Sequence, residues 1–179
     1  MDITVWQTSI WQQYGAAIDT LDAALRACPN HLWRSRLWVE HNPDERPEYA
    51  EFWFLGYHTL KWIDLYLDGK AEGFAPPARF GRYEKEADGF PKTAYTREDL
   101  QAYLAECRRK CRAILDALTD ETALRPCHFD WIGYELPFVE LLLYTLRHVQ
   151  EHAAQMNLWL GQNHVAVDDS VTRAGAGLA

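Results

Sequence analysis

Apolar residues recur at spacings of three and four in four long stretches of the chain, and this pattern restricts the fold more than any other feature. The stretches cover about residues 5–27, 48–67, 96–118 and 135–160. Such spacing places the apolar side chains on one face of an α-helix. No stretch has the convincing alternation that is typical of a half-buried strand. We therefore predict an all-α fold, a four-helix bundle with long connections between the second and third helices and between the third and fourth helices.

Local signals mark several ends of these helices. Thr96 is a good N-cap for the third helix, and Asp99 follows it three residues later. Gly69 ends the second helix, Pro137 suits the first turn of the fourth helix, and Gly161 suits its C-terminal end. The connections over residues 68–95 and 119–134 are long for a compact domain, and connections of this length often contribute to function.

The length and composition are those of one folded domain. A chain of 179 residues, 48% of them hydrophobic, is able to bury a full core. The residues after Gly161 are small and polar. We therefore predict a bundle domain over residues 1–161 and a flexible C-terminal tail over residues 162–179.

Charge and hydropathy argue against several classes of partner. The formal net charge of -8 provides no basic face for phosphate groups, so we expect no nucleic acid partner. The chain has no polybasic segment for a membrane surface and no run of about 18 apolar residues that could cross a membrane. Its first residues lack the features of a signal peptide, so we expect a cytoplasmic protein.

Because we expect a cytoplasmic protein, we also expect its four cysteines to be reduced thiols. Cys107 and Cys111 are four residues apart and could form a second metal site together with Cys127 and His128. Cysteines on the apolar face of a helix are usually buried thiols, so we favour that interpretation.

Two histidines in the fourth predicted helix have the spacing of metal ligands. His148 and His152 are four residues apart, so their rings project from one face of the helix and can share one ion. They flank the apolar stripe of this helix and face away from its charged side. The spacing also arises by chance in a chain with 7 histidines, and a hydrogen-bonded pair at the helix boundary is the simpler interpretation of the spacing alone.

A third histidine, His58, lies in the most apolar helix and shares a face with Phe54, Leu55 and Trp62. A histidine in such a place needs a partner or stays neutral at some cost. It is either a core histidine bonded to a carbonyl, tyrosine or aspartate, or the third ligand of a neutral three-nitrogen metal site. Three protein ligands leave a position open for water or substrate, as in catalytic sites. Imidazole ligands suit zinc, nickel, copper or iron.

Other side chains are candidates for catalytic roles beside these histidines. Glu51 lies seven residues before His58 and could orient a ligand or act as a base, although a solvated glutamate explains it equally well. Gln155 continues the histidine face and could bond a ligand ring or a metal-bound water, although plain packing is an equal interpretation. Tyr57 and Trp62 are interpreted as core residues.

Two segments of the chain resemble the DinB/YfiT-like family of metal-dependent proteins. The first is Phe-Trp-Phe-Leu-Gly-Tyr-His-Thr-Leu at residues 52–60, followed by Asp-Leu-Tyr-Leu at residues 64–67. The second is Leu-Arg-His-Val-Gln-Glu-His-Ala-Ala-Gln at residues 146–155. Together with the four-helix layout, the resemblance covers nearly the whole chain. The arrangement of one histidine plus two is the most specific mark of the family.

The resemblance implies an up-down-down-up bundle, a homodimer, and a Zn²⁺ or Ni²⁺ ion on His58, His148 and His152. It also implies a metal-dependent enzyme that acts on a small molecule. Characterised relatives use low-molecular-weight thiols (mycothiol, bacillithiol or glutathione) in transfer or isomerisation, and hydrolysis has been proposed for others. The chain carries no signature of a thiol cofactor, so thiol transferase and hydrolase both stay open. The alternative is a non-catalytic metal-binding stress-response protein that acts through dimerisation or ligand binding.

Overall fold

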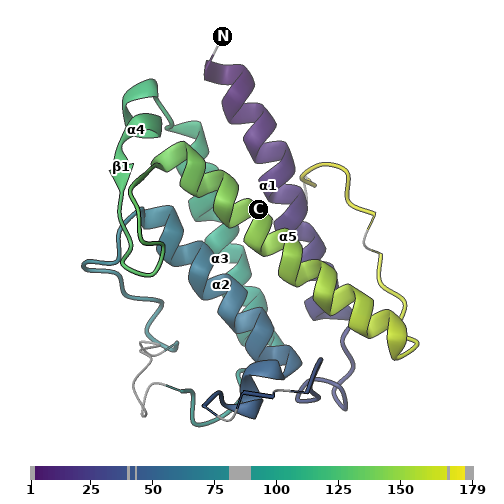
Figure 1. Ribbon diagram of the computed structural model, residues 1–179. Helices are drawn as coiled ribbons and strands as arrows, with labels where there is room; N and C mark the ends of the chain where they lie inside the picture. The colour runs from purple at the N-terminus through teal and green to yellow at the C-terminus, as the bar shows by residue number, and fades with distance from the viewer. Residues whose placement is uncertain (1–2, 40, 43, 81–89, 169, 176–179) are drawn as a thin grey trace.

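The computed structural model describes residues 3–39, 41, 42, 44–80, 90–168 and 170–175, and it is mostly helical. Four long helices lie side by side (Figure 1): α1 (Ile3–Ala27), α2 (Phe52–Asp68), α3 (Arg97–Asp116) and α5 (Phe138–Gln162). Helix α1 packs against α3 and α5, and α2 packs against the same two helices. The prediction of an all-α fold is therefore confirmed.

Two helix ends that carry local signals, the start of α3 and the end of α2, lie where the sequence predicts them. The hydroxyl of Thr96 accepts a hydrogen bond from the backbone N–H of Asp99 at 3.1 Å, and the Asp99 carboxylate accepts one from the backbone N–H of Thr96 at 3.2 Å. This reciprocal capping box starts α3. Gly69 closes α2 in the left-handed conformation, with φ of 72°, which glycine adopts at little cost.

The start of α2 differs from the prediction of a helix from about residue 48. A 3-10 helix, η1 (Pro47–Ala50), comes first, and Glu51 is extended with ψ of 142° before α2 begins. The backbone N–H of Phe52 donates to the carbonyl of Ser35 at 3.0 Å. The segment that contains Ser35 therefore pairs with the backbone at the start of α2 and separates η1 from α2.

The connection between α3 and α5 contains regular structure that the sequence pattern does not predict. It holds the short helix α4 (Asp120–Leu124), and β1 (Pro126–Cys127) pairs antiparallel with β2 (Leu136–Pro137). Because residues 136 and 137 belong to β2, α5 begins at Phe138 rather than near residue 135. In the connection between α2 and α3, residues 81–89 lie outside the described residues.

Helix α2 is buried on almost every side, as its composition predicts. At its centre, a Cβ atom on Gly56 would lie 2.9 Å from the Cδ2 atom of Leu25 on α1 and 3.3 Å from the Cδ1 atom of Leu100 on α3. The absence of a side chain therefore lets α2 approach its neighbours closely. The largest fully buried side chains of the described core are aromatic: Trp53, Tyr14, Tyr57, Tyr103, Phe52 and Phe129.

A buried polar cluster joins α2 to α3 within this core. Asp64 is only 8% exposed, and its carboxylate accepts hydrogen bonds from the Tyr103 hydroxyl at 2.9 Å and from the Lys110 ammonium at 2.6 Å. Lys110 also contacts Asp68 at 2.7 Å. The buried carboxylate is thus both hydrogen-bonded and ion-paired, as burial of a charge requires.

The segment after α5 contacts α1 and α3. The backbone N–H of Gly175 donates to the Asp19 carboxylate at 2.7 Å, and the Arg108 guanidinium donates to the Gly175 carbonyl at 2.6 Å. Arg108 and Asp19 also form an ion pair at 2.9 Å. Whether the bundle and this tail are separate units, divided after residue 161, stays a prediction.

The four cysteines are free and buried: they are Cys28, Cys107, Cys111 and Cys127. Burial raises the pKa of every one of these thiols, and it raises that of Cys28 to about 12 although Arg97 acts in the opposite direction. The thiols therefore stay protonated at neutral pH. Among the described residues, no helix is long and apolar enough to cross a bilayer.

Candidate metal centre

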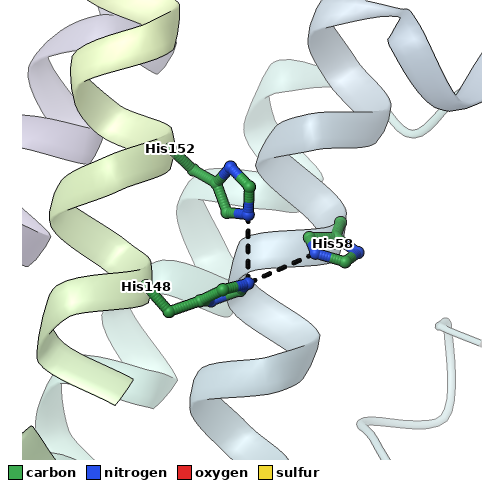
Figure 2. Close-up of side chains that lie close together, drawn as sticks. All are labelled: His58, His148 and His152. Atoms are coloured by element: carbon green, nitrogen blue, oxygen red, sulfur yellow. Dashed lines mark hydrogen bonds between the residues drawn. The ribbon is translucent and has the colours of Figure 1, made fainter. Parts of the chain in front are cut away.

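Helices α2 and α5 pack together and bring three histidines to one place. Figure 2 shows the rings of His148 and His152, which extend from successive turns of α5, pointing toward the ring of His58 on α2. The four-residue spacing places the first two on one face of α5. The packing of the two helices supplies the third, so the predicted set is brought together.

The three Nε2 atoms are spaced like the donor atoms of a metal site. Nε2 of His148 lies 3.3 Å from Nε2 of His58 and 3.0 Å from Nε2 of His152. Two nitrogen ligands at about 2.0 to 2.1 Å from a tetrahedral ion are about 3.3 to 3.4 Å apart. All three donor atoms lie within 4.8 Å of one another. The three histidines could therefore hold one divalent metal ion with modest adjustment.

The neutral charge of two of these rings suits metal binding. Burial lowers the pKa of His58 well below its usual value, and the neighbouring His148, His152 and Lys61 lower it further. Burial likewise lowers the pKa of His148 to about 3, with His152 adding to the effect. At neutral pH both rings are neutral, which is the form of histidine that binds a metal.

The second nitrogen of each ring has a different environment. Nδ1 of His152 donates to the side-chain oxygen of Gln155 at 2.8 Å. Nδ1 of His58 accepts a hydrogen bond from the indole N–H of Trp62 at 3.1 Å. Nδ1 of His148 is buried and has no hydrogen-bond partner in the described part of the chain. The outer contacts of this centre are thus asymmetric.

Glu51 and Gln155, the predicted catalytic residues, lie in different surroundings. Gln155 contacts His152 directly. Glu51 is buried just before α2, where its carboxylate accepts hydrogen bonds from the Trp53 indole at 2.6 Å and from Arg34 at 3.3 Å. Within the described ranges, no hydrogen bond joins Glu51 to the three histidines. The catalytic roles of Glu51 and Gln155 stay predictions.

Trp62, predicted from the sequence to be a core residue, contacts the centre directly. It is half-buried, its ring stacks on Tyr66 with centroids 5.2 Å apart, and it meets the edge of Trp131 at 5.4 Å. A signal was available, since Trp62 follows His58 by four residues and so lies on the same face of α2. That spacing did not reveal which way the indole N–H points.

The weaker hypothesis of a second metal site gains no support. The three histidines are the only group of possible metal ligands found in the described part of the chain. Cys107 and Cys111 face the core, and the ring of His128 contacts Asp130 at 3.3 Å instead of a cysteine.

The histidine set fits a borderline divalent ion better than Mg²⁺ or Ca²⁺, because those ions prefer oxygen ligands. It has no carboxylate or thiolate among its three members, so a bound dication would keep its full charge. Such a centre can polarise or bind an anionic group from a small molecule.

Comparison with known protein families finds one family for most of the chain. The sequence model of the DinB superfamily matches residues 8–156, a span that includes all three histidines. Among curated proteins, no match to the chain is found. The family match extends over most of the chain, from α1 to the last turns of α5. The chain therefore belongs to the DinB superfamily.

Proposed function

We propose that this chain is a metal-dependent enzyme that acts on a small molecule, with Zn²⁺ or Ni²⁺ held by His58, His148 and His152. The observation that carries the proposal is the convergence of three Nε2 atoms from two helices, with separations of 3.0 Å and 3.3 Å between neighbouring atoms. Each neutral ring has only one proton to donate, so hydrogen bonds among the three rings explain this cluster less well than a shared metal ion does.

The chain's own residues would prepare the centre for ligation. The low pKa values of His58 and His148 keep their rings neutral, and Gln155 fixes the ring of His152 with its Nε2 toward the other two. A divalent ion in this position supplies Lewis acidity for a thiol or a water molecule. Because the protein provides three ligands, further positions stay available to the small molecule.

The reaction class is proposed as thiol transfer or hydrolysis. Transfer would use a low-molecular-weight thiol as the second reactant, and hydrolysis would use water. We propose Gln155 as the residue that orients His152 during the reaction. Glu51 stays the candidate base, and its exchange for glutamine in the loaded enzyme tests that role. The alternative, a non-catalytic metal-binding stress-response protein, predicts stable metal binding without turnover.

The family also suggests an assembly and a topology, which we include in the proposal: a homodimer of up-down-down-up bundles. The packing of α1 and α2 against the same two helices is compatible with this topology. The dimer is tested by the molar mass in solution. A dimer has twice the mass of the 20.8 kDa chain, and a value of one chain at micromolar concentration contradicts the assembly.

Metal analysis tests the centre directly. The wild-type chain, a His148→Ala variant and a His128→Ala control are freed of metal, reloaded with Zn²⁺ or Ni²⁺, and analysed for bound metal. His128 is a suitable control because it contacts Asp130 at the surface, outside the centre. We expect one equivalent in the wild type and control and far less in His148→Ala. Equally negligible metal in all three proteins would remove the proposal.

Activity assays then separate the two functional classes. The loaded wild type is offered several low-molecular-weight thiols with electrophilic substrates, and separately ester and amide substrates without a thiol. Turnover that depends on both metal and thiol supports a transferase, and turnover with water alone supports a hydrolase. Full metal occupancy without turnover in either panel favours the non-catalytic alternative.

A further inference from the structure

The hydrogen bond between Trp62 and His58 determines where the proton of the His58 ring lies. The indole Nε1 of Trp62 is 3.1 Å from Nδ1 of His58. An indole N–H can only donate a hydrogen bond, so Nδ1 of His58 is the acceptor and carries no proton. The single proton of the neutral ring is therefore on Nε2.

This proton occupies the nitrogen that a metal ion would need. Nε2 of His58 is the atom that faces His148, at 3.3 Å. A neutral histidine that binds a metal through Nε2 carries its proton on Nδ1. In His58 that proton would point at the indole N–H of Trp62. Two donors cannot form a hydrogen bond with each other, so the two arrangements exclude one another.

His152 has the opposite arrangement. Its Nδ1 faces an acceptor, the side-chain oxygen of Gln155, at 2.8 Å. This contact keeps the proton on Nδ1 and leaves Nε2 free. Gln155 thus holds His152 in the tautomer that can bind a metal, whereas Trp62 holds His58 in the tautomer that cannot.

We propose that Trp62 and a divalent metal ion compete for His58, so that Trp62 is a positioning residue that lowers the metal affinity of the centre. On loading, the proton on Nε2 leaves to solvent, Nδ1 takes up a proton from solvent, and the bond to Trp62 breaks. The indole would then have to turn away from the ring, because two N–H donors would otherwise face each other. This proposal rests on the three-histidine metal site proposed above, and it adds control over how tightly that site holds its ion.

The surroundings of Trp62 allow it both to stay and to move. Tyr66 stacks on its ring at 5.2 Å with an interplanar angle of 26°, which holds the indole in place. Trp131, which meets the edge of the Trp62 ring, is 51% exposed and belongs to the connection between α3 and α5, although its indole N–H donates to the Tyr66 hydroxyl at 2.9 Å. A side chain at the surface can yield to a rotation of its neighbour more readily than a fully buried one.

Zn²⁺ affinity, measured by competition with a chromophoric chelator, tests the competition. Trp62→Phe removes the donor and keeps an aromatic ring, and we expect it to bind Zn²⁺ about threefold to tenfold more tightly than the wild type. Trp62→Gln offers an acceptor to Nδ1 and is expected to bind more tightly still. Trp131→Phe, which changes a ring that contacts Trp62 but not His58, is expected to stay within about twofold of the wild type.

The outcomes separate this proposal from the one on which it rests. If the wild type binds no Zn²⁺, both the metal site and the competition between Trp62 and the metal are refuted. If the wild type binds Zn²⁺ and a folded Trp62→Phe binds it equally or more weakly, only the competition is refuted. A role of Trp62 in packing alone would weaken binding in both variants, so it predicts the opposite direction.

A second measurement uses the wild-type chain and keeps the proposal testable if the variants do not fold. The ¹⁵N shifts of the His58 ring report which nitrogen carries the proton, and the ring is recognised by its contact with an indole N–H. We expect the proton on Nε2 after treatment with a chelator and on Nδ1 after addition of Zn²⁺. A proton on Nδ1 before any Zn²⁺ is added would overturn the proposal.

Discussion

The side-chain oxygen of Gln155 lies 2.8 Å from Nδ1 of His152, one turn further along α5. An acceptor in this place holds the ring with Nε2 directed toward the other histidines, and losing such a contact typically weakens metal binding 10- to 100-fold. Because Gln155 is exposed, we expect Gln155→Leu to weaken Zn²⁺ binding about tenfold. Chelator competition measures the effect. Gln150→Leu, an exposed change on the same helix, should not alter the affinity, and equal affinities for both variants would contradict the role of Gln155.

The buried carboxylate of Asp64 should contribute far more to stability than a surface ion pair. Asp64→Ala removes the carboxylate that the Tyr103 hydroxyl and the Lys110 ammonium both contact, and it leaves Lys110 with Asp68 as its ion-pair partner. We expect the free energy of unfolding to fall by about 2 to 4 kcal/mol. Asp116→Ala, which breaks the exposed pair with Arg112, should cost at most about 0.5 kcal/mol. Urea unfolding measures both, and similar losses would contradict the structure of the cluster.

Gly69 is required by the backbone at the end of α2. Its φ of 72° is unfavourable for any residue with a Cβ atom, and the Arg125 side chain occupies the space beside it. We expect Gly69→Ala to lower the free energy of unfolding by about 1 to 2 kcal/mol. Gly161 is helical and has open space around it, so Gly161→Ala should instead raise stability by up to about 1 kcal/mol. The midpoint temperature of thermal unfolding should fall in Gly69→Ala and rise in Gly161→Ala, relative to the wild type.

Alkaline pH should destabilise the protein through its buried thiols. The pKa of Cys28 rises from 9.0 to about 12 on burial, so an unfolded chain releases this proton near pH 9 while the folded chain keeps it. The unfolded state then binds fewer protons, and stability falls as pH rises from about 9 toward 12, by at most about 1.4 kcal/mol per pH unit for this thiol. Urea midpoints between pH 8 and pH 11 measure the decline. Cys28→Ala should show a shallower decline, and an unchanged slope would contradict the assignment.

The segment after α5 should stabilise the bundle without affecting the metal centre. Removal of residues 170–179 takes away the Gly175 contacts with Asp19 and Arg108. We expect the free energy of unfolding to fall by about 1 to 2 kcal/mol, because each net hydrogen bond contributes about 1 kcal/mol. The metal content after reloading should stay at that of the full chain. Unchanged stability would instead support the prediction of an independent, flexible tail.

The predictable parts of this fold are those with local causes. The start of α3 follows from Thr96 and Asp99, which satisfy each other's backbone within one turn, and the end of α2 follows from Gly69. The pairing of β1 with β2 and the contact of Gly175 with Asp19 have no such signal. Their partners lie apart in the chain, and two-residue strands are too short for alternation to be recognised.

The metal centre was predictable in part for the same reason. The spacing of His148 and His152 is a property of one helix, so it indicates a shared face without further information. The contribution of His58 depends on which side of α2 meets α5, and the family resemblance supplied that step. The hydrogen bond from Trp62 depends on side-chain rotation, which no pattern of residue types determines.

The burial of Cys28, Cys107, Cys111 and Cys127 has a consequence for any sulfur chemistry at the centre. A thiolate is a strong ligand for zinc and nickel, so a mobile cysteine nearby would occupy the position that a substrate needs. Here each thiol is sequestered in the core and held in its protonated form. None of the four cysteines therefore offers a thiolate to the centre, and a thiolate that reaches the three histidines has to belong to another molecule.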